Sequence, residues 1–158
     1  MYVDQVTPDR EVKMTVVLGR GFPLHAGSSS KAFLAFLSQE EQERYMTEHE
    51  LEQLTDSTIV DVAHLRKELR GIRERGFASS FGERQAGAGS VAAPLLDRDG
   101  LPAAVISVCG PLERFREKAD YHANLLLNVT QTISRRLGWG AREDGSSDRT
   151  GSAPSAST

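Results

Sequence analysis

The sequence predicts an α+β fold in which helices cover both faces of an antiparallel sheet. Residues 90–96 and 101–109 are apolar at nearly every position, which is typical of strands buried on both faces. The segment between them, Asp97-Arg98-Asp99-Gly100, ends in Asp-Gly, a strong signal for a hairpin connection. Two segments with helical apolar periodicity, near residues 62–72 and 117–137, would supply the layers that cover this sheet.

Residues 2–18 alternate between apolar and polar side chains with the period of a half-buried strand. Residues 2–6 form one such run, a turn follows at residues 7–10, and Val12, Met14 and Val16 share one face of a second run. We therefore expect a β-hairpin or meander over residues 2–18, ended by the glycines and proline that follow. Because no capping segment precedes the first run, we expect the chain to be a piece cut from a larger protein.

Three helices are expected between residues 28 and 76. The serines at 28–30 are good N-caps for an apolar helix that ends at Ser38. Ser38 and Glu41 match a capping box that opens a second, polar helix, which reaches to about His49. Asp61 is suited to cap a third helix and Gly76 to end it. The apolar residues of this third helix recur at helical spacing: Val62, Leu65, Leu69 and Ile72.

The C-terminal half supplies the rest of the sheet and one long helix. A strand is expected over residues 77–81, followed by a glycine-rich loop to Gly89, and Gly110-Pro111 ends the last strand. The helix over residues 117–137 is expected to gather its apolar residues on one side: Leu126, Val129, Ile133 and Leu137. Residues 141–158 contain no large apolar side chain to offset the entropy of ordering, so we expect a disordered tail.

Length and composition exclude several classes of protein. The 158 residues suit one domain. With 19 Lys and Arg against 22 Asp and Glu, the net charge is −3, and no basic patch indicates nucleic-acid binding by this chain. No apolar run approaches the roughly 20 residues that a membrane-spanning helix needs, and a single cysteine excludes an intramolecular disulfide framework. We expect a soluble, cytoplasmic, globular domain.

Two short motifs resemble those of enzymes. Ser28-Ser29-Ser30-Lys31 is a literal S-x-x-K pattern, in which the lysine would deprotonate Ser28. The partner motifs S-D-N and K-T-G are absent, and capping alone explains the serines. Residues 87–92 match G-x-G-x-x-A, but they precede a strand, which argues against dinucleotide binding. We expect no catalytic residue and no cofactor, and a serine hydrolase using Ser28 and Lys31 remains an alternative.

Metal-ligating and redox side chains are sparse. Histidines 25, 49, 64 and 122 lie on different segments without metal-ligand spacing, so no metal site is expected. A hydrogen-bonded structural role is favoured for His25. Cys109 is expected to lie within a buried strand as a small hydrophobic residue.

Small polar groups interrupt the aliphatic strands at Ser90, Ser107 and Cys109. Ser107 and Cys109 share one face by the two-residue period, and the helix that starts near residue 28 offers free backbone N–H groups. Apolar walls with a few placed donors beside a helix N-terminus suit a small anion.

Six motifs in order resemble the effector-binding domain of IclR-type bacterial transcriptional regulators, over residues 2–139. They are Tyr2-Val-Asp-Gln-Val6, Phe22-Pro-Leu-His-Ala26 with Lys31-Ala-Phe-Leu-Ala35, Leu69-Arg-Gly-Ile-Arg-Glu-Arg-Gly-Phe-Ala78, Val91-Ala-Ala-Pro94, Ile106-Ser-Val-Cys-Gly-Pro111 and Ile133-Ser-Arg-Arg-Leu-Gly138.

The resemblance implies a GAF-like (profilin-like) fold, with an effector-binding domain over residues 1–140. The family's winged helix-turn-helix domain, linker helix and first sheet strand would lie before residue 1, so this chain alone is not expected to bind operator DNA. The resemblance also implies a pocket for small metabolites, often organic or aromatic acids, and assembly into homodimers or homotetramers.

Carried over by position, the resemblance implies a set of pocket residues: Met14, Ser28, Ser29, Ser80, Ser90, Ser107 and Cys109. Met14 would form an apolar wall, and the others would donate hydrogen bonds. Three positions depart from the family: Ser80 lies where some members place a carboxylate, Cys109 where serine is common, and Ser30 where glycine is usual. The pocket is therefore expected to have hydroxyls and a thiol but no obvious side-chain charge.

Three hypotheses follow. The leading one is a ligand-sensing domain that controls attached DNA-binding domains by allostery. The others are the small serine hydrolase and a structural oligomerisation module, which an apolar stripe left on an exposed helix would favour.

Overall fold

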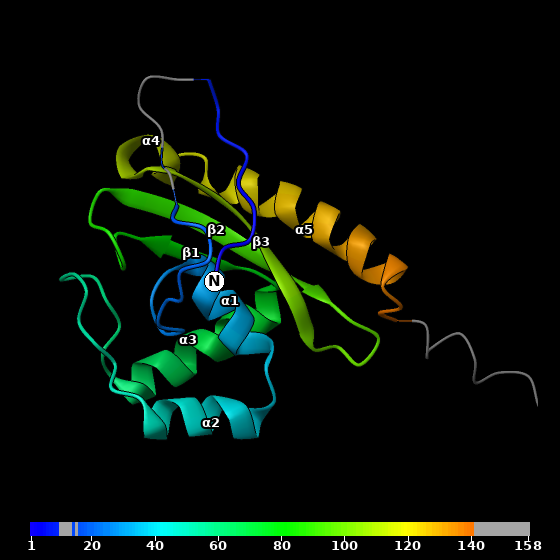
Figure 1. Ribbon diagram of the computed structural model, residues 1–158, viewed down its shortest axis with the longest axis horizontal. Helices are drawn as coiled ribbons and strands as arrows, with labels where there is room; N and C mark the ends of the chain where they lie inside the picture. Colours follow the sequence, from blue (N-terminus) through cyan, green and yellow to red (C-terminus); the bar gives the residue numbers. More distant parts are fainter. Residues whose placement is uncertain (10–13, 15, 141–158) are drawn as a thin grey trace, which may run out of the picture.

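Among residues 1–9, 14 and 16–140, which the computed structural model describes, three strands form an antiparallel sheet with helices on both faces (Figure 1). The strands are β1 (Ala78–Phe81), β2 (Ala88–Leu96) and β3 (Pro102–Pro111), and β2 lies in the middle. The expected α+β class and the covering of the sheet on both faces are confirmed.

The connection between β2 and β3 is the predicted hairpin. The Asp97 N–H donates to the Leu101 carbonyl at 2.9 Å, and the Asp97 carboxylate accepts the N–H groups of Asp99 and Leu101. Gly100 has φ +77°, a left-handed conformation that favours glycine. β2 starts two residues earlier than expected, because its first residues pair with Gly110 and Pro111 at the end of β3.

Helices α1 (Ser28–Phe36), α2 (Gln39–Glu48) and α3 (Val62–Arg75) lie on one side of the sheet (Figure 1). The Ser38 and Glu41 capping box, the Asp61 cap and the left-handed Gly76 with φ +84° are all present as predicted. α1, α3 and the sheet bury a common core. Its residues include Leu34, Ala35, Leu65, Leu69, Ile72, Ala78 and Ala92.

Helices α4 (Leu112–Arg116) and α5 (Ala119–Arg136) cover the other face. The expected apolar side of the long helix is partly wrong: Leu126 is buried, but Val129 and Leu137 are 49% and 48% exposed. α5 instead turns mostly small residues inward: Ala119, Ala123, Leu126, Thr130 and Ser134. Small side chains let the helix lie close to β2, and the Ser134 hydroxyl accepts the Leu96 N–H at 2.9 Å.

The expected serine caps of α1 are wrong. Gly27 is the N-cap residue, with φ 90°, and no side chain caps the helix. Its N–H instead donates to the Glu83 carboxylate at 3.1 Å. Ser28 is therefore the first residue inside the helix, and its hydroxyl is free to bond elsewhere.

The β-hairpin expected over residues 2–18 is not found among the residues described there, and residues 10–13 and 15 lie outside them. A single bridge joins Tyr2 and Leu18, and the Gly19 N–H donates to the Tyr2 carbonyl at 2.8 Å. The side chain of Gln5 replaces strand pairing by bonding the Met14 carbonyl and the Val16 N–H. Val6 is 94% exposed, so this apolar residue of the first run is not buried in a core.

β3 forms one edge of the described sheet, and this corrects the expectation for Cys109. The residue is exposed rather than buried, because no described strand pairs with the outer edge of β3. The tail expected over residues 141–158 lies outside the described residues. None of the described helices is long and apolar enough to cross a membrane.

Candidate functional site

Two rows of residues cross the sheet on the face that α1 covers. The register aligns Ser80, Ser90 and Cys109 across the three strands, and Ala78, Ala92 and Ser107 in the row two residues along. Residues paired directly opposite share a face, as do residues two apart on one strand. The four predicted strand residues Ser80, Ser90, Ser107 and Cys109 therefore lie on the same face. Ala92 in the second row packs in the core with α1.

Ser28 joins the start of α1 to this surface. Its hydroxyl donates to the Ser90 hydroxyl, with the two oxygens 2.7 Å apart, and Ser28 itself is 2% exposed. Ser29, the next predicted residue, accepts from the Tyr2 hydroxyl at 3.3 Å. The first N–H groups of a helix have no partner within the helix, so this end of α1 favours negative charge.

The remaining predicted residue, Met14, lies on the N-terminal segment rather than on the sheet. Its described polar contact is through its backbone carbonyl, which accepts from Gln5 Nε2 at 3.1 Å.

The sequence reasoning missed Arg84, which brings a positive charge to this region. Its Nη1 donates to the Tyr2 hydroxyl at 3.2 Å, and its guanidinium carbon lies 4.3 Å from the centroid of the Phe22 ring. Partial desolvation raises the pKa of the Cys109 thiol, and the positive charge of Arg84 opposes this shift. Arg84 lies in the β1–β2 loop, which sequence reasoning read as a glycine-rich connection. No sequence pattern marks it, because its place beside α1 depends on contacts between residues distant in sequence.

Lys31 is not arranged as a catalytic base. Its ammonium contacts Glu83 Oε1 at 2.6 Å and Glu68 Oε1 at 3.2 Å, and its side chain is 2% exposed. Its Nζ is thus directed at two carboxylates, whereas the Ser28 hydroxyl bonds Ser90. The S-x-x-K pattern therefore encodes a buried ion-pair network.

Glu68 extends this network to the surface. Burial acts to raise the pKa of its carboxyl group, but the attraction of Lys31 and Arg75 outweighs it, so the pKa lies below its usual range. Arg75 Nη2 contacts Glu68 Oε1 at 3.0 Å.

His25 has the structural role favoured by the sequence. It is fully buried, and its Nε2 lies 2.9 Å from the Glu52 carbonyl, which can only accept a hydrogen bond. Nε2 therefore donates this hydrogen bond, and Nδ1 lies 3.0 Å from the Tyr45 hydroxyl. No cluster of three metal-ligating side chains occurs in the described part of the chain.

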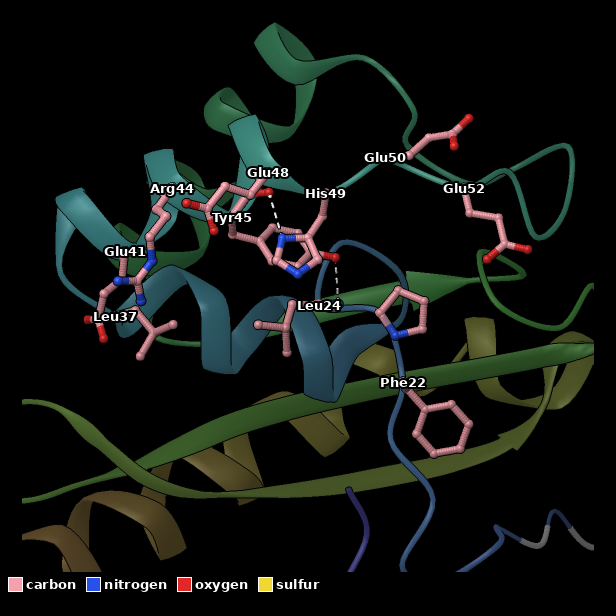
Figure 2. Close-up of a pocket in the computed structure, with 11 residues that line it drawn as sticks. Phe22, Leu24, Leu37, Glu41, Arg44, Tyr45, Glu48, His49, Glu50 and Glu52 are labelled. Carbon is pink, nitrogen blue, oxygen red and sulfur yellow. Dashed lines mark hydrogen bonds between the residues drawn. The ribbon is translucent and has the colours of Figure 1, made fainter.

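Two hollows lie away from the predicted pocket residues. A groove of about 650 Å³ runs beside α2. The rings of Tyr45 and His49 line it and stack on each other, as Figure 2 shows. Their centroids are 4.7 Å apart. A smaller one, of about 180 Å³, lies between Arg73, Leu127 and Trp139. None of the predicted pocket residues lines either hollow.

The fold, an antiparallel sheet with helices on both faces and a row of polar side chains under the start of α1, defines a class of α+β domain. The family profile described as "Bacterial transcriptional regulator IclR C-terminal" matches residues 1–135. The chain therefore belongs to the IclR family and corresponds to its C-terminal, effector-binding domain, which is a regulatory domain and not an enzyme.

Individual relatives agree with this assignment. The Escherichia coli transcriptional repressor IclR is 33% identical over 115 residues, which cover 73% of this chain and 42% of that protein. The crystal structure of Thermotoga maritima IclR superposes with a TM-score of 0.81 at 33% identity, over 86% of this chain and 56% of that one. The GAF-like fold implied by the resemblance is confirmed.

A third relative was solved with a small molecule. The inducer-binding domain of the transcription factor PobR from Acinetobacter, a double mutant in complex with 3-hydroxybenzoic acid, has a TM-score of 0.68 at 28% identity. It covers 75% of this chain and 69% of that one. The chain spans about half the length of the curated relatives it matches.

Proposed function

We propose that this chain binds a small organic or aromatic acid between the sheet and the N-terminus of α1. The observation that carries the proposal is the 2.7 Å contact between the Ser28 and Ser90 hydroxyls, which joins the helix start to the polar rows of the sheet. The residues proposed to line the site are Met14, Ser28, Ser29, Ser80, Ser90, Ser107 and Cys109.

The chemistry of these groups favours an acid. Unpaired backbone N–H groups at a helix N-terminus bind carboxylates, and the neighbouring hydroxyls can donate further hydrogen bonds. The Cys109 thiol, whose pKa is raised by desolvation, stays protonated at neutral pH and can donate as well. Each neutral donor contributes only about 0.5–1.5 kcal/mol, so several are needed together. The PobR domain supports this proposal, because a similar fold is seen there with 3-hydroxybenzoic acid.

The proposed output is control of transcription by the full-length protein. A ligand shifts an equilibrium between two arrangements by as much as its affinities for them differ. Here the two arrangements would be those of the winged helix-turn-helix domains attached to this domain in the full-length protein. These domains would contact the operator DNA. The membership of the IclR family supports this part of the proposal.

A thermal-shift screen of the purified chain against small organic and aromatic acids, including 3-hydroxybenzoic acid, tests the proposal. A ligand at 100 times its Kd stabilises the native state by about 2.7 kcal/mol, which raises Tm by several degrees for a domain of this size. The variant Ser107→Ala should lose the shift. Ser79→Ala is the matched control, because Ser79 pairs with Val91 on the opposite face. Hits that Ser107→Ala retains would place the ligand elsewhere.

A second function, self-association into homodimers or homotetramers, is supported by the outer surface of α5. Tyr121, Leu125 and Val129 follow one another at a spacing of four and are 62%, 46% and 49% exposed. Such a row lies along one side of a helix. An exposed apolar row is typical of a surface that another protein covers.

A further inference from the structure

The β1–β2 loop places two neighbouring residues of opposite charge in different surroundings. Glu83 points inward, where its carboxylate accepts from Lys31 Nζ at 2.6 Å and from the Gly27 N–H at 3.1 Å. Its backbone carbonyl accepts the Thr58 hydroxyl at 2.6 Å. These three hydrogen bonds hold Glu83 in place, and they therefore also set the position of the Arg84 backbone.

Arg84 extends from that fixed point along the start of α1. A Cβ added to Gly27, the N-cap residue, would lie 3.9 Å from Arg84 Cβ and 4.0 Å from its Nη1. The guanidinium also packs on aromatic rings, with its central carbon 4.3 Å from the Phe22 centroid and 5.4 Å from that of Tyr2. These contacts hold the group beside the first N–H groups of the helix.

Among the residues that the structure describes, none neutralises the charge of Arg84. Lys31 pairs with Glu83, and no ion pair between Arg84 and a carboxylate is found in the described part of the chain. The group that Nη1 contacts, the Tyr2 hydroxyl, is neutral and bridges to Ser29. The guanidinium therefore adds a full positive charge to the partial positive charge of the helix N-terminus.

We infer that Arg84 is the specificity-determining residue of this site and binds the carboxylate of the ligand in place of the Tyr2 hydroxyl. The inference rests on the proposed function. A guanidinium bonds a carboxylate through two parallel N–H groups, which a neutral hydroxyl cannot match. Arg84 supplies the side-chain charge that the sequence did not reveal, and it makes the site select acids over their neutral analogues.

Calorimetric titration with matched pairs of probes tests this role. The acids are benzoate, 3-hydroxybenzoate, pyruvate and succinate, each compared with its primary amide. Every acid that binds the unchanged chain should bind Arg84→Gln at least about tenfold more weakly, since a charged hydrogen bond is lost. Arg84→Lys should give an intermediate loss. Any amide that binds should be affected little by either change.

Arg20→Gln is the matched control, because Arg20 also stacks on Phe22, at 5.9 Å, and its removal changes the net charge equally. It should leave acid binding unchanged. Equal acid affinity for the unchanged chain and for Arg84→Gln overturns the inference while the proposed function stands. If no acid binds the unchanged chain, the proposed function fails and the inference fails with it.

Discussion

At the scale of single residues, the ion pair between Lys31 and Glu83 is the most buried of the ion pairs found among the described residues. Their side chains are 2% and 10% exposed, so neither charge can return to water when the other is removed. Glu83 also accepts the Gly27 N–H, which ties the pair to the start of α1. The same pair thus supports both the core and the proposed site.

Replacing Lys31 by methionine should lower the free energy of unfolding by about 3–5 kcal/mol, because Glu83 is left as an unpaired buried charge. Adding Glu83→Gln should restore much of the loss, since the amide oxygen can still accept from Gly27. Urea unfolding measures both variants.

The surface pair between Arg66 and Glu43 is the control, with side chains 41% and 43% exposed. Arg66→Met should cost at most about 1 kcal/mol, because water screens such a pair. A loss for Lys31→Met no larger than this would show that the buried pair does not matter for stability.

The sequence could predict the residue types of the proposed site better than its charge. Ser107 and Cys109 were predicted to share one face from the two-residue period of a strand, and the register agrees. Arg84 could not be predicted, because its position depends on Glu83 pairing with Lys31, which is 52 residues away in sequence. Cys109 was expected to be buried because an apolar strand does not reveal that it lies at a sheet edge.

At the scale of secondary-structure elements, α3 shows how local signals determine helix boundaries. Asp61 accepts the His64 N–H at 2.7 Å, and Gly76 ends the helix with its N–H donating to Ile72. Both signals act within a few residues, so the sequence predicted them. The first run of the expected N-terminal hairpin, residues 2–6, is not a strand in the structure, because alternation needs a partner strand and sequence spacing alone does not provide one.

Two glycines of α3 should respond in opposite ways to alanine. Gly76→Ala should destabilise the domain by about 1–2 kcal/mol, because a side chain is strained at its φ of +84°. The new Cβ would also lie 3.0 Å from Leu127 Cδ2.

Gly71→Ala should stabilise the domain by up to about 1 kcal/mol, because Gly71 lies inside the helix and alanine has the higher helix propensity. Its new Cβ meets only the flexible end of Arg75, at 3.2 Å. Thermal unfolding of both variants measures the difference, and changes of the same sign would contradict this account of the helix end.

At the scale of the whole molecule, the two faces of the sheet are covered in different ways. The α1 and α3 side buries large aliphatic residues, whereas α5 lies against β2 mainly through small ones. Several large apolar residues of α5, among them Leu125 and Val129, are therefore left on its outer side. The predicted apolar face of the long helix was partly wrong for this reason: it was chosen by hydrophobicity, whereas the face that packs on β2 is set mainly by small side-chain size.

The double variant Leu125→Glu and Val129→Glu should reduce self-association, because it places two charges in the exposed row of α5. Sedimentation velocity should show a shift toward the monomer, with unchanged circular dichroism as the check on folding. Asn124→Glu and Asn128→Glu add the same charge to the same helix outside this row and should leave the oligomeric state unchanged. If the first pair has no effect, the row is not the interface.

The neighbouring Glu83 and Arg84 have a consequence for how such a domain can diverge. The inward residue must be acidic to satisfy Lys31, but the next position is not constrained by the core. A single substitution there would change the charge beside α1 while the buried contacts of Glu83 are kept. Ligand preference could therefore change from anions to neutral or cationic compounds without a loss of stability.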